Sequence, residues 1–458
     1  MAKLDNVGIK CFNEIRYEQK PLPPRLQEFI PIKPDSSRRH FTVKTKFLTL
    51  HRSPSTDAYG ESSDGVFDEV NKFVKTQRLQ ALPPYLFIEI DKKKRALLQA
   101  GKDVINLGVG DPDLPTHRFI IDEMAKAIYD PKNHRYPFDE GVPAYRKAAA
   151  DFMQRRFGVA ADADSQILTT IGSKDGISHI PLAVINPGDV VLVPQPGYPV
   201  YNSGAIFAGG RVYVMPLEAK NHFLPDFESI PENIRQQTKL VWLNYPNNPT
   251  AASAPLSFYQ HVVELAHRYG WIIASDLAYG EVYFEQPPPS ILQVPGAMDV
   301  AIEFHSLSKS FNMTGWRIGW AVGNPQVIAA LAQVKGNVDS GQFNAIQVAG
   351  AVALNQYDHP DVKKQMQIYR GRRDVLCDGL IKLGWRMEKP TAGFFCWTQT
   401  PGGKPSMDIC SRLLEEAHVV TVPGGGFGPA GEGFLRMALT VDEGRLAEAV
   451  ARIGKLAL

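Results

Sequence analysis

Short apolar runs alternate with longer spans of helical periodicity through the middle of the chain, between residues 166 and 322. Alternation of this kind is typical of an α/β layer, in which helices pack on a mainly parallel sheet. We interpret each short run as a strand that is followed by a loop and a helix. The predicted strands are Gln166–Thr170, Val190–Val193, Arg211–Met215, Leu240–Leu243, Trp271–Ser275, Ala301–His305 and Ile318–Val322.

The flanking segments carry longer helical patterns. Towards the N-terminus, a predicted strand at Val104–Leu107 lies between helices at Ile88–Gln99 and Arg118–Tyr129, and a further helix ends at Phe157. Beyond residue 322 the pattern is strongly helical and then mixed, which favours a smaller α+β domain. The helices predicted there are Gln326–Val334, Phe343–Asn355, Asp361–Leu383 and Met407–Ala417, and the strands are Trp385–Glu388, Phe394–Thr398, Val419–Val422 and Gly433–Leu439.

Residues 1–78 differ in composition from the rest of the chain. They contain a proline-rich piece at 21–24, a basic piece at 36–40 and a Ser/Asp/Gly stretch at 53–65. No apolar segment of the kind found in a secretory signal follows the start. We interpret this segment as a flexible extension with at most one short helix, Val66–Val74. The expected division is an extension at 1–78, an N-terminal arm and part of the small domain at 79–115, a large domain at 116–335, and a long connecting helix with the C-terminal small domain at 336–458.

Length and composition narrow the classes of function. At 458 residues the chain can form a large core and more than one domain. A formal net charge of +2 gives no argument for a nucleic-acid or anionic membrane partner. No apolar run approaches the roughly 20 residues that a membrane-spanning helix needs. The four cysteines show no metal-ligand spacing, so we expect reduced thiols in a cytoplasmic protein and no metal site.

Polar residues stand directly beyond several predicted strands, where ligands bind in parallel sheets. After the first strand, Gly172-Ser173-Lys174 offers backbone N–H groups and a hydroxyl to a phosphate, or is an ordinary helix cap. Tyr198 can stack on a planar ring or belong to the core. Asn248 lies in a rigid loop rich in proline and asparagine, from which its amide can donate to a phenolate oxygen. Asp276 ends an apolar strand and needs a cationic partner, such as a protonated pyridine nitrogen.

A lysine stands beyond the strand Ala301–His305, among small hydroxylated residues. At the mouth of a sheet the amine of Lys309 would be partly desolvated, which lowers a lysine pKa and frees the amine to condense with an aldehyde. Arg317 can supply a fixed cation for a phosphate at the same site. The alternative is a solvated loop lysine, the usual state of this residue type. Arg436, on the last predicted strand, is an arginine amid apolar residues and needs a carboxylate from protein or ligand.

The string S-x-S-K-x(7)-R-x-G from Ser306 to Gly319 resembles the lysine segment of pyridoxal-phosphate (PLP) aminotransferases of classes I and II. With the other strand-end loops, the resemblance covers roughly 380 residues, from Leu79 to the C-terminus. It implies the aspartate-aminotransferase fold, an α/β large domain with a mainly parallel sheet plus a smaller α+β domain. More specific strings are similar to the LL-diaminopimelate aminotransferases, the bacterial branch more than the plant one; they are residues 84–87, 108–116, 133–137, 244–250 and 305–317.

The resemblance also implies a role for individual residues at the cofactor, pyridoxal 5'-phosphate. Lys309 would bind the aldehyde and carry the proton, Asp276 would pair with the pyridine nitrogen, and Tyr198 would stack on the ring. Asn248 and Tyr279 would hydrogen-bond the 3-oxygen. The residues expected around the phosphate are Ser173, Lys174, Ser306, Ser308 and Arg317, together with Tyr136 from a second copy of the chain.

For the substrate, the resemblance implies that Arg436 binds the α-carboxylate, helped by the backbone of Gly110 and by Lys174 and Asn248. Tyr85 and Glu140 stand where the family recognises the far end of the substrate, with Glu140 acting across a homodimer. Glu140 is the less secure transfer, because Asp139 lies in the same loop. One departure lies in the cofactor loop: Ala251 occupies the position at which most relatives have glycine, so a shifted loop is expected there.

The implied activity is transamination between LL-2,6-diaminopimelate and 2-oxoglutarate in lysine biosynthesis, by a cytoplasmic homodimer with shared active sites. An aminotransferase for aspartate, alanine or aromatic amino acids is the first alternative, because substrate preference depends on a few side chains. The same fold also serves β-elimination and cyclisation. A PLP-binding regulator is a further alternative, and it needs a DNA-binding module that residues 1–78 do not supply.

Overall fold

The computed structural model describes residues 75–82, 87–137 and 140–458, and these belong to one unit, Phe73–Leu458. Almost the whole proposed extension lies outside the described residues, as do the predicted helix Val66–Val74 and Tyr85. The proposed domain boundaries therefore stay predictions.

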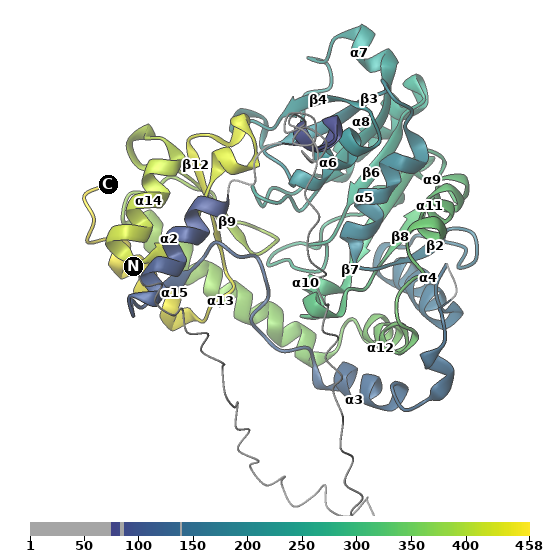
Figure 1. The fold of residues 1–458 in the computed structure, drawn as a ribbon, viewed down its shortest axis with the longest axis horizontal. Coiled ribbons are helices and arrows are strands. Elements are labelled where there is room, and N and C mark those ends of the chain that lie inside the picture. Colours follow the sequence, from purple (N-terminus) through teal and green to yellow (C-terminus); the bar gives the residue numbers. More distant parts are fainter. Residues whose placement is uncertain (1–74, 83–86, 138–139) are drawn as a thin grey trace, which may run out of the picture. The chain divides into compact units, whose positions relative to one another are not determined.

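A seven-stranded sheet forms the centre of the described chain (Figure 1). Neighbouring strands are parallel except at β8, which runs antiparallel to both of its neighbours. The predicted mainly parallel α/β sheet is therefore confirmed. In spatial order the strands are β2 (Ile167–Thr170), β8 (Gly319–Gly323), β7 (Ala301–Ser306), β6 (Ile272–Asp276), β5 (Thr238–Asn244), β3 (Val190–Gln195) and β4 (Arg211–Pro216).

Two separate apolar cores cover the two faces of this sheet. Side chains alternate between the faces along a strand, so Val190 and Leu192 of β3 belong to one core, and Val191 and Val193 belong to the other. Because both faces are buried, the strands read as continuous apolar runs in the sequence. The first core contains α4 (Pro143–Phe157), α8 (Leu256–Tyr269) and α12 (Asn344–Asn355), and the second contains α5 (Ser173–Val184), α6 (Pro199–Phe207) and α11 (Pro325–Val338). Helix α3 (Arg118–Ala127) packs on α12.

The C-terminal part forms a smaller layer of helices on short strands, with a third core of its own. A three-stranded antiparallel sheet has the order β11 (Val422–Pro423), β12 (Phe434–Ala438) and β9 (Phe395–Gln399). A parallel pair, β1 (Ile105–Asn106) and β10 (Val419–Val420), joins the early chain to this layer. Its helices are α13 (Pro360–Lys382), α14 (Ser406–Ala417) and α15 (Glu443–Ile453), together with α2 (Phe87–Gln99) near the N-terminal end.

Two sequence predictions for this layer were wrong or incomplete, and one helix was missed. The predicted strand Trp385–Glu388 makes only one isolated bridge, Met387 to Thr398, because Pro390 and exposed charged residues follow instead of a pairing edge. The predicted strand Val419–Val422 divides into two short strands that belong to different sheets. Helix α15 was not predicted at all.

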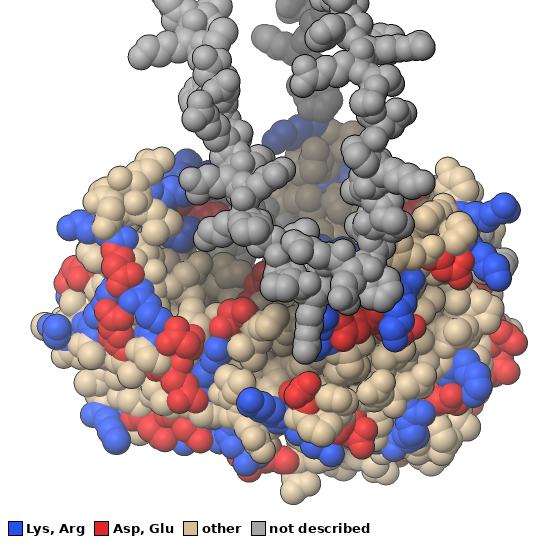
Figure 2. Space-filling view, turned by 90° about the horizontal axis from the view of Figure 1, so that it is seen from below, with Lys and Arg blue, Asp and Glu red and all other residues tan. Residues whose placement is uncertain are grey.

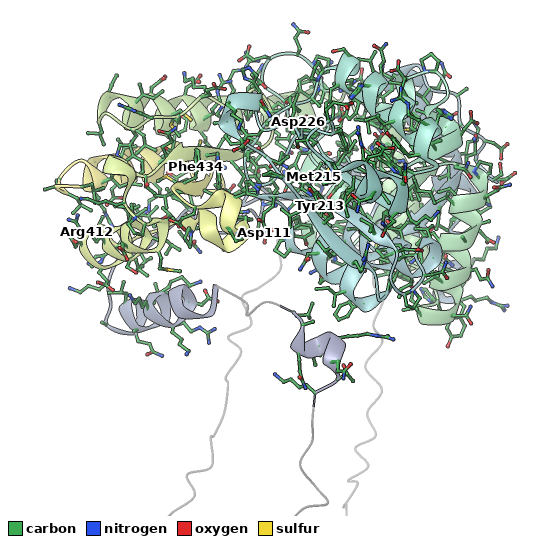
Figure 3. All side chains as sticks on the ribbon, turned by 90° about the horizontal axis from the view of Figure 1, so that it is seen from above. Asp111, Tyr213, Met215, Asp226, Arg412 and Phe434 are labelled. Carbon is green, nitrogen blue, oxygen red and sulfur yellow. The ribbon has the colours of Figure 1, made fainter. Side chains whose placement is uncertain are left out.

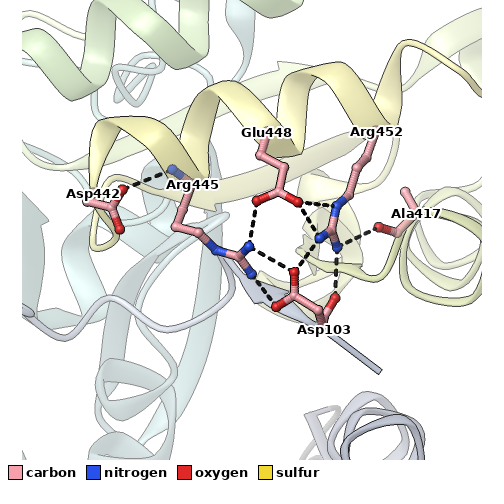
Figure 4. A network of polar contacts seen from close by, with 6 residues as sticks. All are labelled: Asp103, Ala417, Asp442, Arg445, Glu448 and Arg452. Atoms are coloured by element: carbon pink, nitrogen blue, oxygen red, sulfur yellow. Dashed lines mark hydrogen bonds and ion pairs between the residues drawn. The ribbon is translucent and has the colours of Figure 1, made fainter. Parts of the chain in front are cut away.

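A charged cluster fastens α15 to the start of β1 (Figure 4). The carboxylate of Asp103 accepts bonds of 2.6 and 2.8 Å from Arg445 and a further bond from Arg452. Hydrogen bonds from Arg445 and then Arg452 lower the pKa of Asp103 to about 2. Glu448 lies between the two guanidinium groups on the same helix. The early segment of the chain is thereby held against its C-terminal helix.

Charged side chains of both signs are spread over one face of the described chain. On the face drawn in Figure 2, acidic and basic side chains are interspersed rather than gathered by sign. Among the described residues, none of the helices combines the length and the apolar character needed to cross a lipid bilayer.

The loop after β5 makes a tight turn at Ala251, the position at which the resemblance leads us to expect glycine. Ala251 is buried and has a φ of 60°, in the left-handed region that glycine favours. Its N–H donates to Asn247 O over 2.8 Å, and Asn247 N donates to Ala252 O over 2.9 Å. The loop therefore makes a tight turn with a backbone conformation that glycine would adopt without strain, and the expected shift of the loop stays a prediction.

Ala251→Gly should change the free energy of unfolding by less than about 1 kcal/mol, because opposing effects nearly cancel. Relief of the left-handed alanine is worth roughly 1–2 kcal/mol. Against it stand about 0.4–1 kcal/mol of unfolded-state entropy and about 0.8 kcal/mol for a buried methyl group. Urea unfolding measures the difference. Ala251→Val is the control and should lose more than about 2 kcal/mol, because a β-branched residue fits poorly at positive φ; a large effect of glycine alone would contradict the account.

Candidate active site

A cavity of about 350 Å³ lies beyond the carboxyl ends of three central strands. Asn244 ends β5, Asp276 ends β6 and Ser306 ends β7, and all three line the cavity. The small layer closes the other side with Phe395 from β9 and Arg436 from β12. The site therefore sits where parallel sheets bind their ligands, as predicted.

Asp276 is the buried acid of the cavity. Its side chain is 5% exposed, and it accepts bonds from Tyr201 Oη over 2.7 Å and from the backbone N–H of Ala278 over 3.1 Å. Burial raises the pKa of Asp276 to about 6, although both of these donors work against that rise. Both donors are neutral, so a positively charged ligand atom would find a carboxylate whose charge is only partly stabilised.

Lys309 is the amine of the cavity and lies on the short helix α10 (Leu307–Ser310). Its Nζ donates to the carbonyl oxygen of Gly110 over 2.8 Å. Burial lowers the pKa of Lys309 to about 8, and the positive charges of Arg317 and Arg436 act in the same direction. The carboxylate of Asp111 opposes them. At mildly alkaline pH a substantial fraction of this amine is therefore unprotonated and nucleophilic.

One end of the cavity is built to receive an anion. The guanidinium of Arg317 lies over Gly172, where a Cβ atom would come within 2.4 Å of Nη2. Gly172 has a φ of 71°, and it directly precedes Ser173, the first residue of α5. Arg317 Nη1 also lies 3.5 Å from the hydroxyl of Ser308. A guanidinium, two hydroxyl groups and a helix N-terminus together match the donors that a phosphate needs.

The opposite end of the cavity presents Arg436, which is 7% exposed. Its Nη1 donates to Asn248 Oδ1 and its Nη2 donates to Gly108 O, both over 2.8 Å. The guanidinium also lies 4.3 Å from the ring centre of Phe395. Arg436 thus presents a buried guanidinium to the cavity, and this is the type of group that binds a carboxylate by two parallel hydrogen bonds.

A second cavity of about 340 Å³ continues from this end and shares Gly110, Lys174, Tyr198, Asn248 and Arg436 with the first. Its remaining lining is apolar except for a few polar groups. Two of these polar groups are charged, Asp91 and Lys94 of α2. They form an ion pair with 2.5 Å between Lys94 Nζ and Asp91 Oδ1.

The structure brings most of the predicted site residues together. The first cavity is lined by Gly110, Ser173, Lys174, Tyr198, Asn248, Asp276, Tyr279, Ser306, Ser308, Lys309, Arg317 and Arg436. Tyr136 and Glu140 are exposed and line neither cavity of this chain, and Tyr85 lies outside the described residues.

Sequence reasoning missed several residues that shape the site. No role for Tyr201 or Asn244 followed from the spacing of these residues in the sequence. Tyr201 binds the Asp276 carboxylate, and Asn244 donates to Asp276 O over 2.8 Å and accepts from Asn248 N over 2.9 Å. Asp111 lies where the yellow and blue-green groups of elements meet in Figure 3. In the sequence, Asp111 directly follows Gly108-Val109-Gly110, and this position could have indicated that it lies at the site.

Comparison with known proteins agrees with this arrangement. The family model for aminotransferase class I and II matches residues 102–453. The LL-diaminopimelate aminotransferase of Aquifex aeolicus is 52% identical over 387 residues, which cover 84% of this chain and 100% of that protein. The protein of the same name from Nitratidesulfovibrio vulgaris strain Hildenborough is 51% identical, with 84% and 99% covered.

Solved structures share the fold. The substrate-bound BacF structure from Bacillus subtilis has a TM-score of 0.81 at 36% identity and covers 84% of this chain and 99% of its own. A double mutant of Thermus thermophilus aspartate aminotransferase has a TM-score of 0.79 at 29% identity, with 84% and 100% covered.

The low pKa of Lys309 predicts a distinctive pH profile for aldehyde capture. Burial disfavours the ammonium form, so the amine becomes neutral above pH of about 8, whereas an exposed lysine needs a pH of roughly 10.4. After removal of any bound carbonyl compound, borohydride trapping of a small aldehyde should modify Lys309 with a midpoint near pH 8. Peptide mass spectrometry measures the extent.

Asp111→Asn is the matched variant, because the Asp111 carboxylate holds the pKa of Lys309 up. Its profile should move to lower pH. A midpoint above pH 10 in the unsubstituted protein would show that Lys309 is solvated.

Proposed function

We propose that this chain, which belongs to the class I and II aminotransferase family, transfers an amino group from LL-2,6-diaminopimelate to 2-oxoglutarate. The observation that carries the proposal is the identity of about half of all residues to LL-diaminopimelate aminotransferases across nearly their whole length. An aminotransferase for aspartate, alanine or aromatic amino acids remains the competing function, because a few side chains decide substrate preference.

The cofactor of this family is pyridoxal 5'-phosphate, and the residues of the cavity fit it. The donors for its phosphate are Arg317, Ser173 and Ser308, and Arg317 can lie close to the Ser173 turn because Gly172 has no side chain. The buried Asp276 carboxylate lacks a cation among its hydrogen-bond donors, and a protonated ring nitrogen supplies one. The Lys309 amine is the group for the aldehyde.

When bound, the cofactor supplies an aldehyde that condenses with amines and a protonated ring that withdraws electrons from the substrate Cα. Lys309 would hold the cofactor until the substrate amine replaced it, and its freed amine would then be the base for the proton on Cα. Asp276 keeps the proton on the ring nitrogen. Asn248 and Tyr279 hold the 3-oxygen, and Tyr198 covers the ring. As the amine that lines the cavity, Lys309 would also be the group that returns the proton.

A substrate with two amino-acid ends suits the pair of connected cavities. Arg436 binds the carboxylate at the reacting end. The second cavity offers apolar walls for the methylene chain, and Asp91 and Lys94 offer one negative and one positive group to the far ammonium and carboxylate. Tyr85 and Glu140 complete this end, Glu140 from a second copy of the chain.

A homodimer follows from the same assignment. Tyr136 is 87% exposed and would reach the phosphate site of a second copy, beside the loop that carries Glu140. Each active site then contains groups from two chains. We place this homodimer in the cytoplasm, where the buried thiols of Cys377, Cys396 and Cys410 stay reduced.

Assay of the purified protein with 2-oxoglutarate should give glutamate from LL-diaminopimelate at a kcat/KM at least about tenfold above that for aspartate, alanine or phenylalanine, a difference of about 1.4 kcal/mol. Glutamate formation by a coupled dehydrogenase measures it. Lys309→Ala should abolish turnover with every donor and the absorbance of bound cofactor. Preference for another donor would transfer the assignment to that amino acid, and pyruvate without keto-acid exchange would indicate elimination.

The pair Asp91 and Lys94 should matter only for the far end of the substrate. The double variant Asp91→Asn/Lys94→Met should raise KM for LL-diaminopimelate by roughly five- to tenfold, the value of one or two partly exposed charged contacts. The half-reaction with alanine, which has neither a far ammonium nor a far carboxylate, is the control and should stay within about twofold. Equal losses with both substrates would place the pair outside the substrate site.

A further inference from the structure

A fully buried lysine lies directly behind the phosphate end of the cavity. Lys335, near the end of α11, is 1% exposed and lines neither of the two connected cavities. Its ammonium donates to Asp339 Oδ2 over 2.9 Å and to Asp175 Oδ2. Burial of an ammonium group costs free energy unless carboxylates surround it, and Asp339 and Asp175 supply this compensation for Lys335.

Asp175, one of these two carboxylates, belongs to helix α5, whose N-terminus faces the proposed phosphate site. Asp175 lies in the first turn of α5, two residues after Ser173, and accepts from the backbone N–H of Ile171 over 2.8 Å. Its other oxygen lies 2.7 Å from His179 Nδ1. Burial would raise the pKa of Asp175, but the bonds from His179 and Lys335 hold it below its ordinary value. The carboxylate is therefore charged. It connects Ile171, before Gly172, to helix α5, after Gly172, and so fixes the turn between them.

The segment that follows Lys335 also contacts Arg317, the second part of the phosphate site after the Ser173 turn. Asp339 Oδ1 accepts from Gly341 N over 2.7 Å, which shapes the turn after α11. The next side chain, Gln342, is buried and donates from Nε2 to Trp316 O over 2.7 Å and to Arg317 O. Arg317 has a φ of 56°, so its backbone needs such support. Residues 335–342, which we call the brace, therefore contact both parts of the phosphate site: the Ser173 turn through Asp175, and the backbone of Arg317.

We propose that Lys335 is a positioning residue for the phosphate of the cofactor, acting through Asp175 and the brace. It fixes the Ser173 turn, and it neutralises a carboxylate that shares a helical turn with Ser173. Without Lys335, the Asp175 charge would face a dianionic phosphate across that turn, and like charges in a buried site repel strongly. Gln342 fixes Arg317 from the same segment.

The test compares cofactor binding with and without its phosphate. Holoenzyme of Lys335→Met is prepared, its cofactor release rate is followed by absorbance, and the resolved full-length protein is titrated with pyridoxal 5'-phosphate and with pyridoxal. The variant should weaken binding of the phosphorylated form at least about tenfold more than that of pyridoxal, a differential of about 1.4 kcal/mol. A purely structural lysine would weaken both equally, and that result would overturn the proposal.

Asp175→Asn/Lys335→Met separates charge from packing, because it removes the repelling carboxylate together with its cation. It should restore most of the preference for the phosphorylated form; no restoration would overturn the electrostatic argument. If Lys335→Met does not fold, this double variant and Gln342→Leu decide the question. Gln342→Leu leaves the ion pairs intact and should also lower the affinity for the phosphorylated form selectively.

Arg235→Met is the matched control for loss of a largely buried, paired cation. Arg235 lies on α7 (Glu232–Gln237), pairs with Glu228 and Glu232 and is 14% exposed, outside the lining of the cavity. Its ratio of affinities for the two cofactor forms should equal that of the unsubstituted protein. A selective loss in this control would show that general destabilisation produces the effect.

Discussion

The structure depends on keeping an acid and an amine out of water without letting them neutralise each other. Asp276 and Lys309 line the same cavity, yet within the described chain no ion pair joins them. The acid is held by a phenol and a backbone N–H, and the amine is held by a carbonyl oxygen. Desolvation then moves their pKa values towards each other, to about 6 and about 8. A direct ion pair would have reversed both shifts and filled the space that a ring needs.

Neutral hydrogen-bond donors at the ends of the strands keep the Asp276 carboxylate apart from the Lys309 amine. Asn244 binds the backbone of both Asp276 and Asn248, so the ends of β5 and β6 are fixed relative to each other. Tyr201 is itself stacked on Trp242, with ring centres 4.7 Å apart. Its hydroxyl therefore reaches Asp276 from a rigid position. Rigid neutral donors orient a carboxylate without supplying the positive charge that the ligand is meant to bring.

The elements that could be predicted from sequence were those with a local cause. The central strands were recognisable because both faces are buried, and the strand-end residues followed from the topology of parallel sheets. Tyr201 could not be assigned, because whether a tyrosine faces the core or the site depends on packing across α6 and β6. Tyr136 and Glu140 present a different limit, since their proposed roles need a second chain. By contrast, α15 had a readable signal that was overlooked: an Asp442 cap and buried residues at 446, 449 and 453.

The bond between Arg436 and Asn248 joins the small layer to the large one across the cavity, and it lies where the substrate carboxylate would bind. A carboxylate that enters with two parallel bonds to the guanidinium competes with the Asn248 oxygen and is the stronger acceptor. Under the proposed function, substrate binding would replace this neutral contact between the layers by a charged one through the ligand. The side chain of Asn248 also hydrogen-bonds Tyr279, the second residue assigned to the 3-oxygen. The proposed assignment would therefore couple recognition of the carboxylate to polarisation of the ring through one asparagine.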